Sequence, residues 1–256
     1  MGSALVCAAC KNENIEILIA DKLSGKAESL SEQTSGRARV SDSKTIAETC
    51  DLIFLGVKPS FVADALGEIY SSIEARESKP TLVSMAAGVR IEKIASLTSK
   101  LCPVIRIMPN TPVSVGEGMI LYDICPAVTE DIENTFLDVM KYAGKLDKLS
   151  ENLIDAASAL SGCGPAFAFM FIEALSDGAV ACGLPRDKAL FYAEQTLLGS
   201  AKLALESAKH PGELKDAVCS PGGSTIEGVR VLEESAFRGA SANAVIASYE
   251  KTKTLA

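Results

Sequence analysis

The sequence has no tryptophan and only one histidine, His210, in 256 residues. A single histidine cannot supply both imidazole ligands of an HExxH metal site, and it leaves one candidate for any catalytic triad that needs an imidazole. Aromatic residues are also scarce, at 5%, while hydrophobic residues reach 48% and charged residues 23%. These values are ordinary for globular proteins, so extensive disorder is excluded.

The chain has no basic region either. Its formal net charge of −8 divides evenly, at −4 each, between residues 1–150 and 151–256. An evenly acidic protein is poorly suited to bind nucleic acid or an anionic membrane surface, so we expect neither partner.

Eight cysteines lie scattered among apolar residues, and no secretory signal precedes them. This usage is typical of reduced thiols in a cytoplasmic protein rather than of a disulfide framework. Cys7 and Cys10 form a CxxC pair, but no second pair and no nearby histidine completes a metal site. We therefore predict no metal, and we interpret the pair as two small positions in a helix.

The longest uncharged stretch, Ala156–Ile172, approaches the length of a membrane span. Gly162-Cys163-Gly164-Pro165 lies in its middle and would break a spanning helix. The pattern predicts a tight turn that opens a buried helix of a soluble protein.

Residues 1–150 alternate short apolar runs with helical stretches, which predicts an α/β domain with a largely parallel sheet covered on both faces. The expected strands are Ile15–Ala20, Asp51–Val57, Thr81–Met85, Val104–Met108 and Met119–Tyr122. The expected helices are Lys26–Thr34, Thr45–Glu48, Phe61–Ile73, Ile91–Ser99 and Glu130–Tyr142.

The sequence pattern of residues 151–256 predicts a smaller, all-helical domain. Its expected helices are Asn152–Leu160, Ala166–Cys182, Arg186–Ser207, Pro211–Ala217, Ile226–Glu234 and Phe237–Thr252. The helix Ala166–Cys182 is apolar nearly all round, so it must be covered on every side, and so small a domain offers little cover. We expect burial against a second subunit, with burial inside the monomer as the alternative.

Three of the expected strands end in short motifs whose backbone conformation is restricted and which carry polar side chains. Val57-Lys58-Pro59 ends the first, Ser84–Gly88 ends the next with small residues, and Pro109–Pro112 follows the third. Each motif is weak alone, since a proline after a strand is usually a turn. Together they favour a ligand crevice, because the carboxyl ends of parallel strands meet at one edge of a doubly wound sheet.

Ser220-Pro221-Gly222-Gly223-Ser224-Thr225 directly precedes the helix Ile226–Glu234. Such a loop leaves several backbone N–H groups free at the positive end of the helix dipole, which suits a carboxylate or a phosphate. An ordinary Ser/Thr cap is the alternative, but the loop is longer than a cap requires.

At these motifs the sequence resembles the pyrroline-5-carboxylate reductase family, which catalyses the last step of proline biosynthesis. The matching segments are Val57–Pro59, Ala86–Val89, Arg106–Pro112, Ser161–Phe167, His210–Gly212, Leu214–Asp216, Ser220–Thr225 and Arg230–Glu233. They run through nearly the whole chain in family order, and the stretch from His210 to Glu233 is highly specific.

The resemblance implies an NAD(P)H-dependent oxidoreductase that reduces 1-pyrroline-5-carboxylate to L-proline. It implies a Rossmann-type, doubly wound parallel sheet in residues 1–150 and a helical, dimerising substrate domain in residues 151–256. The residues implied to bind the cofactor, NADPH or NADH, are Gly2, Asp21, Lys22, Val57, Lys58, Pro59, Ala86, Ala87 and Asn110. Those implied to bind the substrate carboxylate are Ser220, Gly222, Gly223, Ser224 and Thr225, with Thr225 as the catalytic hydroxyl near the ring nitrogen.

The choice between the two cofactors stays open. Asp21 would favour a free ribose hydroxyl, whereas Lys22 beside it would accept a 2′-phosphate. A site without histidine is adequate, because hydride addition to a C=N carbon depends on the alignment of two rings more than on a strong acid or base.

Two positions depart from the family pattern. Cys163 replaces the usual serine, a small change that we expect to be tolerated. Met1-Gly2-Ser3 matches only the end of the family's GxGxMG loop, so the first strand and first two glycines have no counterpart. We therefore expect weakened cofactor binding and a loosened first domain.

Two alternatives stay open. One is a truncated, non-catalytic dimerising homologue. The other is a related two-domain imine or hydroxyacid reductase, although several of those carry a catalytic lysine where Gly164–Glu173 has none.

Overall fold

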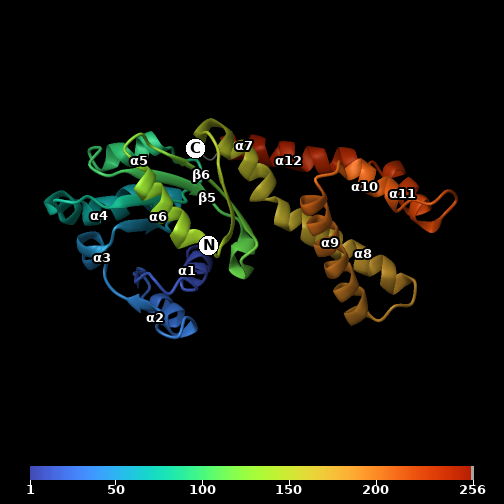
Figure 1. The fold of residues 1–256 in the computed structure, drawn as a ribbon, viewed down its shortest axis with the longest axis horizontal. Coiled ribbons are helices and arrows are strands. Elements are labelled where there is room, and N and C mark those ends of the chain that lie inside the picture. The colour runs from blue at the N-terminus through green and yellow to red at the C-terminus, as the bar shows by residue number, and fades with distance from the viewer. Residues whose placement is uncertain (255–256) are drawn as a thin grey trace. The chain divides into compact units, whose positions relative to one another are not determined.

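The computed structural model describes residues 1–254 (Figure 1). Its contacts divide the chain into two compact units: among the described residues, unit 1 holds 1–163 and 248–254, and unit 2 holds Gly164–Ala247. The first division lies later than the boundary after Ser150 that the sequence predicts. The reason is that helix α7 (Glu151–Ser161) packs on strands of unit 1.

Unit 1 contains a five-stranded sheet in the order β3-β4-β5-β6-β7. Its strands are β3 (Leu52–Leu55), β4 (Thr81–Ser84), β5 (Val104–Met108), β6 (Gly118–Ile124) and β7 (Gly144–Lys148). β3, β4 and β5 are parallel, in a register that pairs Leu55 with Ser84 and Ser84 with Arg106. The α/β class and the parallel sheet predicted from the sequence are therefore confirmed.

Strand β6 departs from the expected parallel arrangement, because it runs antiparallel to β5 while β7 runs parallel to β6. The connection from β5 to β6 holds only the short 3-10 helix η2 (Thr111–Val115) and a turn at Gly116, whose φ of 83° favours glycine. A parallel return would need a crossover of about a dozen residues or more, so the chain turns back beside β5.

A second, separate pair of parallel strands consists of β1 (Ile17–Ile19) and β2 (Ala38–Val40). Among the described strands, β1 and β2 pair only with each other and form a sheet apart from the five-stranded one. β2 and β7 are absent from the sequence-based assignment, because each is short or charged and exposed along much of its length.

Helices cover both faces of the five-stranded sheet. On one face, α1 (Gly2–Ala9) and α6 (Glu130–Met140) pack against Ile105, Ile107 and Ile120. On the other face, α3 (Ser43–Thr49), α4 (Val62–Ala75) and α5 (Ile91–Leu97) pack against Ile53 and Leu82. Helix α2 (Ser24–Gln33) covers β1 and β2. These two layers bury the core that holds the strand ends in place.

Unit 2 is helical over its described length. Its helices are α8 (Gly164–Ala181), α9 (Arg186–Ser207), α10 (Pro211–Ala217), α11 (Ser224–Glu234) and α12 (Phe237–Lys253), the last of which continues into unit 1. α8 and α9 pack against each other, yet Ser176 is the only fully buried residue of α8. Phe169 is 62% exposed and Met170 is 69% exposed, so part of the apolar surface of α8 has no cover within the unit.

The segment Glu151–Ala181, which comprises α7, a turn and α8, is long and apolar enough by length and composition to cross a membrane. The turn consists of Gly162 and Cys163, where the sequence predicts it. The α7 part of this segment buries Ile154 and Ala159.

Candidate functional site

The polar strand ends predicted from the sequence lie together at one edge of unit 1. Lys58 and Pro59 follow β3 and open the 3-10 helix η1 (Pro59–Phe61), Ala86 and Ala87 follow β4, and Asn110 follows β5. Because these three strands are parallel neighbours, their carboxyl ends are adjacent. Val57 is partly buried against the core below β3, Lys58 is exposed, and Ala86 is 1% exposed.

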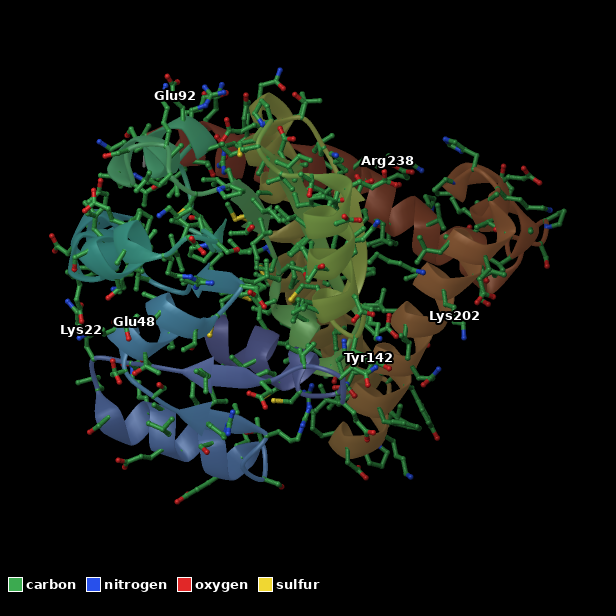
Figure 2. The ribbon with its side chains drawn as sticks, turned by 60° about the vertical axis from the view of Figure 1, so that its left-hand side comes forward. Lys22, Glu48, Glu92, Tyr142, Lys202 and Arg238 are labelled. Carbon is green, nitrogen blue, oxygen red and sulfur yellow. The ribbon has the colours of Figure 1, made fainter. Side chains whose placement is uncertain are left out.

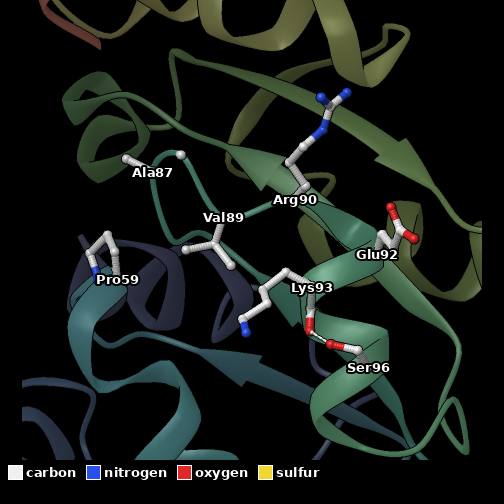
Figure 3. A pocket seen from close by; sticks show the side chains of 8 residues that line it. Pro59, Ala87, Val89, Arg90, Glu92, Lys93 and Ser96 are labelled. Carbon is white, nitrogen blue, oxygen red and sulfur yellow. Dashed lines mark hydrogen bonds between the residues drawn. The ribbon is translucent and has the colours of Figure 1, made fainter. Parts of the chain in front are cut away.

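A cavity of about 570 Å³ opens between the loops after β3 and β4. Figure 3 shows Pro59 on one side, Ala87 and Val89 on the other, and Lys93 reaching in from α5. Its remaining lining residues are Gly88, Arg90, Glu92 and Ser96. The α5 residues that line this cavity could not be identified from the sequence, because the pattern of an amphipathic helix does not indicate which loop its polar side faces.

The start of α1 lies beside the end of β3. A Cβ placed on Gly56 would lie 3.9 Å from the Cα of Gly2, so the two backbones approach closely with no side chain between them. Met1 is the N-cap of α1 and makes no side-chain hydrogen bond to the helix, so the first N–H groups of α1 have no side-chain partner. The structure thus brings Gly2 to the same edge as the β3 loop.

Asp21 and Lys22 follow β1 in the separate strand pair. The Asp21 carboxylate accepts a hydrogen bond from the backbone N–H of Leu23 at 2.9 Å, which closes a local turn. Lys22 is exposed at the surface, with its ammonium 6.0 Å from the ring centroid of Phe61 (Figure 2). Of the two side chains, the lysine is therefore the one without a partner in the turn.

The buried side chain of Asn110 is already used within the fold. Its amide Nδ2 donates to the carbonyl of Ser161 at 2.9 Å, and its Oδ1 accepts from the N–H of Met119 at 2.9 Å. One amide hydrogen stays available for a ligand.

The predicted substrate loop belongs to unit 2, whereas every predicted cofactor residue belongs to unit 1. Gly222 has a φ of 68°, which favours glycine, and Gly223 is the N-cap of α11. No side chain caps α11, so the N–H groups at Ser224 and Thr225 have no side-chain acceptor. The structure thus shows no Ser/Thr side-chain cap at this helix start.

The other candidate chemical groups are structural in this fold. His210 is the N-cap of α10, where its Nδ1 accepts from the N–H of Gly212 at 3.1 Å. Burial raises the pKa of the thiols of Cys10, Cys50 and Cys102, which keeps them protonated at neutral pH. Among residues 1–254, no group of three or more His, Cys, Asp or Glu side chains is arranged to hold a metal ion.

Known sequences match this chain over most of its length. Residues 151–255 match the family described as pyrroline-5-carboxylate reductase dimerisation, and residues 1–88 match one described as NADP oxidoreductase, coenzyme F420-dependent. The pyrroline-5-carboxylate reductase of Escherichia coli is 42% identical over 82% of this chain and 77% of its own length. The protein of the same name from Arabidopsis thaliana is 40% identical over 84% of this chain and 76% of its own length.

Solved structures show the same arrangement of elements. A pyrroline-5-carboxylate reductase from Coxiella burnetii superposes with a TM-score of 0.88 at 28% identity, covering 100% of this chain and 94% of the other. The Plasmodium falciparum pyrroline carboxylate reductase with NADP bound gives 0.84 at 30% identity, over 99% and 94%. The prephenate dehydrogenase of Aquifex aeolicus, with a TM-score of 0.52 at 11% identity over 92% and 96%, shares the fold alone. The chain belongs to the pyrroline-5-carboxylate reductase family.

Proposed function

We propose that this protein catalyses the reduction of 1-pyrroline-5-carboxylate to L-proline with NADPH or NADH. The observation that carries the proposal is the 42% identity to a reductase of that name over 82% of the chain, which spans both units. In this reaction a hydride adds to the imine carbon, and a proton adds to the ring nitrogen.

The edge of unit 1 fits a dinucleotide. The start of α1 offers backbone N–H groups without a side-chain cap, and it lies beside the end of β3, where Gly2 and Gly56 carry no side chain. The small side chains of Ala86 and Ala87 leave space for a flat ring beside the 570 Å³ cavity. A bound nicotinamide would supply the hydride at this edge.

The other proposed cofactor contacts come from the loops around it. Val57, Lys58 and Pro59 border the same edge, and Asn110 has one amide hydrogen left to donate. Lys22 is free to approach a 2′-phosphate, whereas the Asp21 carboxylate is engaged with the N–H of Leu23. This difference favours NADPH over NADH.

The loop before α11 is proposed to bind the substrate carboxylate. The N–H groups of Ser224 and Thr225 lie at the positive end of the helix dipole, which stabilises an anion, whereas the N–H of Gly223 donates to the carbonyl of Ser220 at 3.0 Å. Ser220 and Gly222 belong to the same loop, and the Thr225 hydroxyl would hydrogen-bond the ring nitrogen. The contribution of the protein is alignment of the substrate ring, since the described residues offer no imidazole beyond the helix cap His210.

We propose that the protein acts as a homodimer or larger homo-oligomer in the cytoplasm. The exposed apolar residues of α8 and α9 would be covered by a second copy. A lipid environment suits them less well, because α7, at the start of the same apolar segment, buries Ile154 and carries Glu151 and Asp155. The net charge of −8 gives no attraction to nucleic acid or to anionic lipid.

The test is NADPH oxidation in the presence of 1-pyrroline-5-carboxylate, with L-proline identified as the product. We expect proline to form in equal amounts to the NADPH consumed, and NADH to support a lower rate. Cofactor binding without turnover would identify a non-catalytic homologue. Turnover of a hydroxyacid or of another imine, but not of this substrate, would place the protein in a different reductase class.

A further inference from the structure

Helix α7 is joined to the sheet by an ionic network centred on the buried side chain of Arg106. This residue lies within β5, and 1% of its side chain is exposed. Its Nη2 donates to Asp155 Oδ1 at 2.6 Å, and its Nη1 donates to Glu151 Oε1 at 3.3 Å. The two carboxylates lie one turn apart on α7, so a single guanidinium connects two turns of the helix to the sheet.

The start of α7 has further ties to the same unit. Asp123 is the register partner of Arg106 on β6, and its Oδ2 accepts the N–H of Glu151 at 2.6 Å. A carboxylate at this position also interacts favourably with the helix dipole. Glu151 accepts the N–H of Ile91 at 2.6 Å as well. We refer to Arg106, Asp123, Glu151 and Asp155 as the α7 clamp.

The end of α7 is held too. The carbonyl of Ser161, its last residue, accepts the amide of Asn110 at 2.9 Å. Gly162 and Cys163 follow as a turn, and the division between the two units falls directly after Cys163. The chain is therefore fixed to unit 1 up to the last residue of α7, and it enters unit 2 from that point.

Stability alone is a poor explanation for this network. A buried ion pair is often no more stabilising than apolar residues of the same volume, and the other residues near Arg106 on β5, Val104, Ile105 and Ile107, are apolar. Two buried side-chain polar atoms in the described part of the chain have no hydrogen-bond partner, and both belong to residues of β5 or α7: Arg106 Nε and Ser161 Oγ. Such unpaired atoms are costly and rare. The network is better explained as a device that fixes a position.

We propose that Arg106 is a positioning residue of the reductase, which acts through the α7 clamp. The clamp sets the point at which the chain leaves the cofactor unit for the unit that carries the Ser220–Thr225 loop. The inference rests on the proposed function, because ring alignment is what such a reaction needs from the protein. A displacement of about 1 Å in a reacting pair can lower the rate by about a hundredfold.

Asp155→Asn is the variant that tests the proposal. It keeps the shape of the side chain and removes the charge, and Asp155 is 37% exposed, so the change is milder for folding than a change of Arg106 itself. We expect kcat, normalised to the sites that bind NADPH, to fall about tenfold, while the Kd for NADPH changes less than about twofold. Asp155→Glu restores the carboxylate and should recover most of kcat.

Lys148→Met is the matched control, because it removes another ion pair of unit 1, to Glu133 at 2.9 Å, that involves no residue of α7. Its kcat should equal that of the wild type. An unchanged normalised kcat in Asp155→Asn overturns the proposal. So does a loss that Asp155→Glu fails to rescue, or an equal loss in Lys148→Met.

Hydrogen exchange separates this proposal from the proposed function. In Asp155→Asn, amides of residues 151–163 should exchange faster than in the wild type, while those of β3 and β4 should not change. A wild-type protein without reductase activity would refute the proposed function, and exchange alone would then decide whether the clamp holds α7. Unchanged exchange in residues 151–163 overturns the clamp.

Discussion

The two units of this protein bury their apolar residues very differently. Unit 1 covers both faces of its sheet with helices, and two clusters of aliphatic and aromatic side chains lie inside it. In unit 2 the fully buried residues among those described are Ser176, Ala189 and Ala193, all of them small. The large apolar residues of α8 and α9 lie on the outside, among them Phe169, Met170, Phe191 and Leu198.

Unit 1 therefore has the buried core of an independently folded domain, whereas unit 2 has the exposed apolar surface typical of one side of a subunit interface. Soluble monomers rarely expose apolar surface on this scale, so such a surface marks an interaction site. We therefore propose that a second copy covers the apolar surface of unit 2, whereas the proposed cofactor residues all belong to unit 1.

The largest expected effect comes from charging the surface of unit 2. Phe169→Glu combined with Phe191→Glu places two carboxylates on α8 and α9, at positions that are 62% and 58% exposed in one chain. If a second copy covers them, association should weaken by about a thousandfold or more, since each large apolar contact at an interface centre contributes about 2 kcal/mol. Sedimentation should then show monomers, and an assay of NADPH oxidation should show a loss of activity.

The matched control for this variant is Val115→Glu, which charges a side chain that is 71% exposed on unit 1. We expect it to leave the assembly intact. Equal sedimentation of the double variant and the wild type would show that this surface is not the interface.

The next largest effect concerns the loop before α11. Thr225→Ala removes a hydroxyl at a helix start without a side-chain cap, and we expect turnover to fall about ten- to a hundredfold, because a hydrogen bond to a charged partner contributes about 1.5–3 kcal/mol. Thr196→Ala, whose hydroxyl donates to the carbonyl of Tyr192 at 2.6 Å, is the control in the same unit. Identical kinetics for Thr225→Ala and wild type would remove Thr225 from the site.

A smaller effect should be confined to unit 1. Ala87→Leu adds bulk to the wall of the 570 Å³ cavity, and we expect the Kd for NADPH to rise about tenfold, since overpacking costs about 1–3 kcal/mol. Ala63→Leu, on the exposed side of α4, should bind NADPH normally. Fluorescence titration measures both, and sedimentation should show no change in assembly for either. Equal affinity of Ala87→Leu and wild type would place the cofactor elsewhere.

The smallest effect tests the core of unit 1 through pH. Burial, and then the hydrogen bond that its hydroxyl donates to Glu133 at 2.8 Å, raise the pKa of Tyr122 to about 12 from its ordinary 10.0. The neutral hydroxyl therefore stabilises the fold fully below pH 10, and this stabilisation is lost as the pH rises through 12.

Tyr122→Phe should accordingly lower the free energy of unfolding by about 1 kcal/mol at pH 8, and Tm by about 2–4 °C. The difference from wild type should shrink between pH 10 and pH 12, over the range of the shifted pKa. Thermal melts across this range measure it, and a difference that grows with pH would contradict the assignment.

The elements that could be predicted from the sequence are those with strong local signals. The buried strands β3, β4 and β5 appear as uninterrupted apolar runs, and the apolar α8 indicates a missing cover. The short exposed strand β2 and the charged edge strand β7 have no such run, and the antiparallel course of β6 depends on the length of a loop rather than on its own residues.

The candidate-site residues likewise include some that could be predicted from the sequence and some that could not. Val57-Lys58-Pro59 and the Ser220–Thr225 loop are contiguous motifs, so the chain itself displays them. Arg106 is different, because its carboxylate partners lie 45 and 49 residues further along, on α7. An arginine inside the apolar run Val104–Met108 was the available signal of a buried ion pair, but only the fold shows which carboxylates meet it.

The central claim, that a second copy covers the apolar surface of unit 2, is tested most directly by sedimentation of the wild-type 256-residue protein at micromolar and submicromolar concentration. Interference optics suit the measurement, because the chain has no tryptophan and five tyrosines. We predict a species of at least twice the chain mass of 26.8 kDa across the whole range. A folded monomer of 26.8 kDa that does not aggregate at any of these concentrations would contradict this claim.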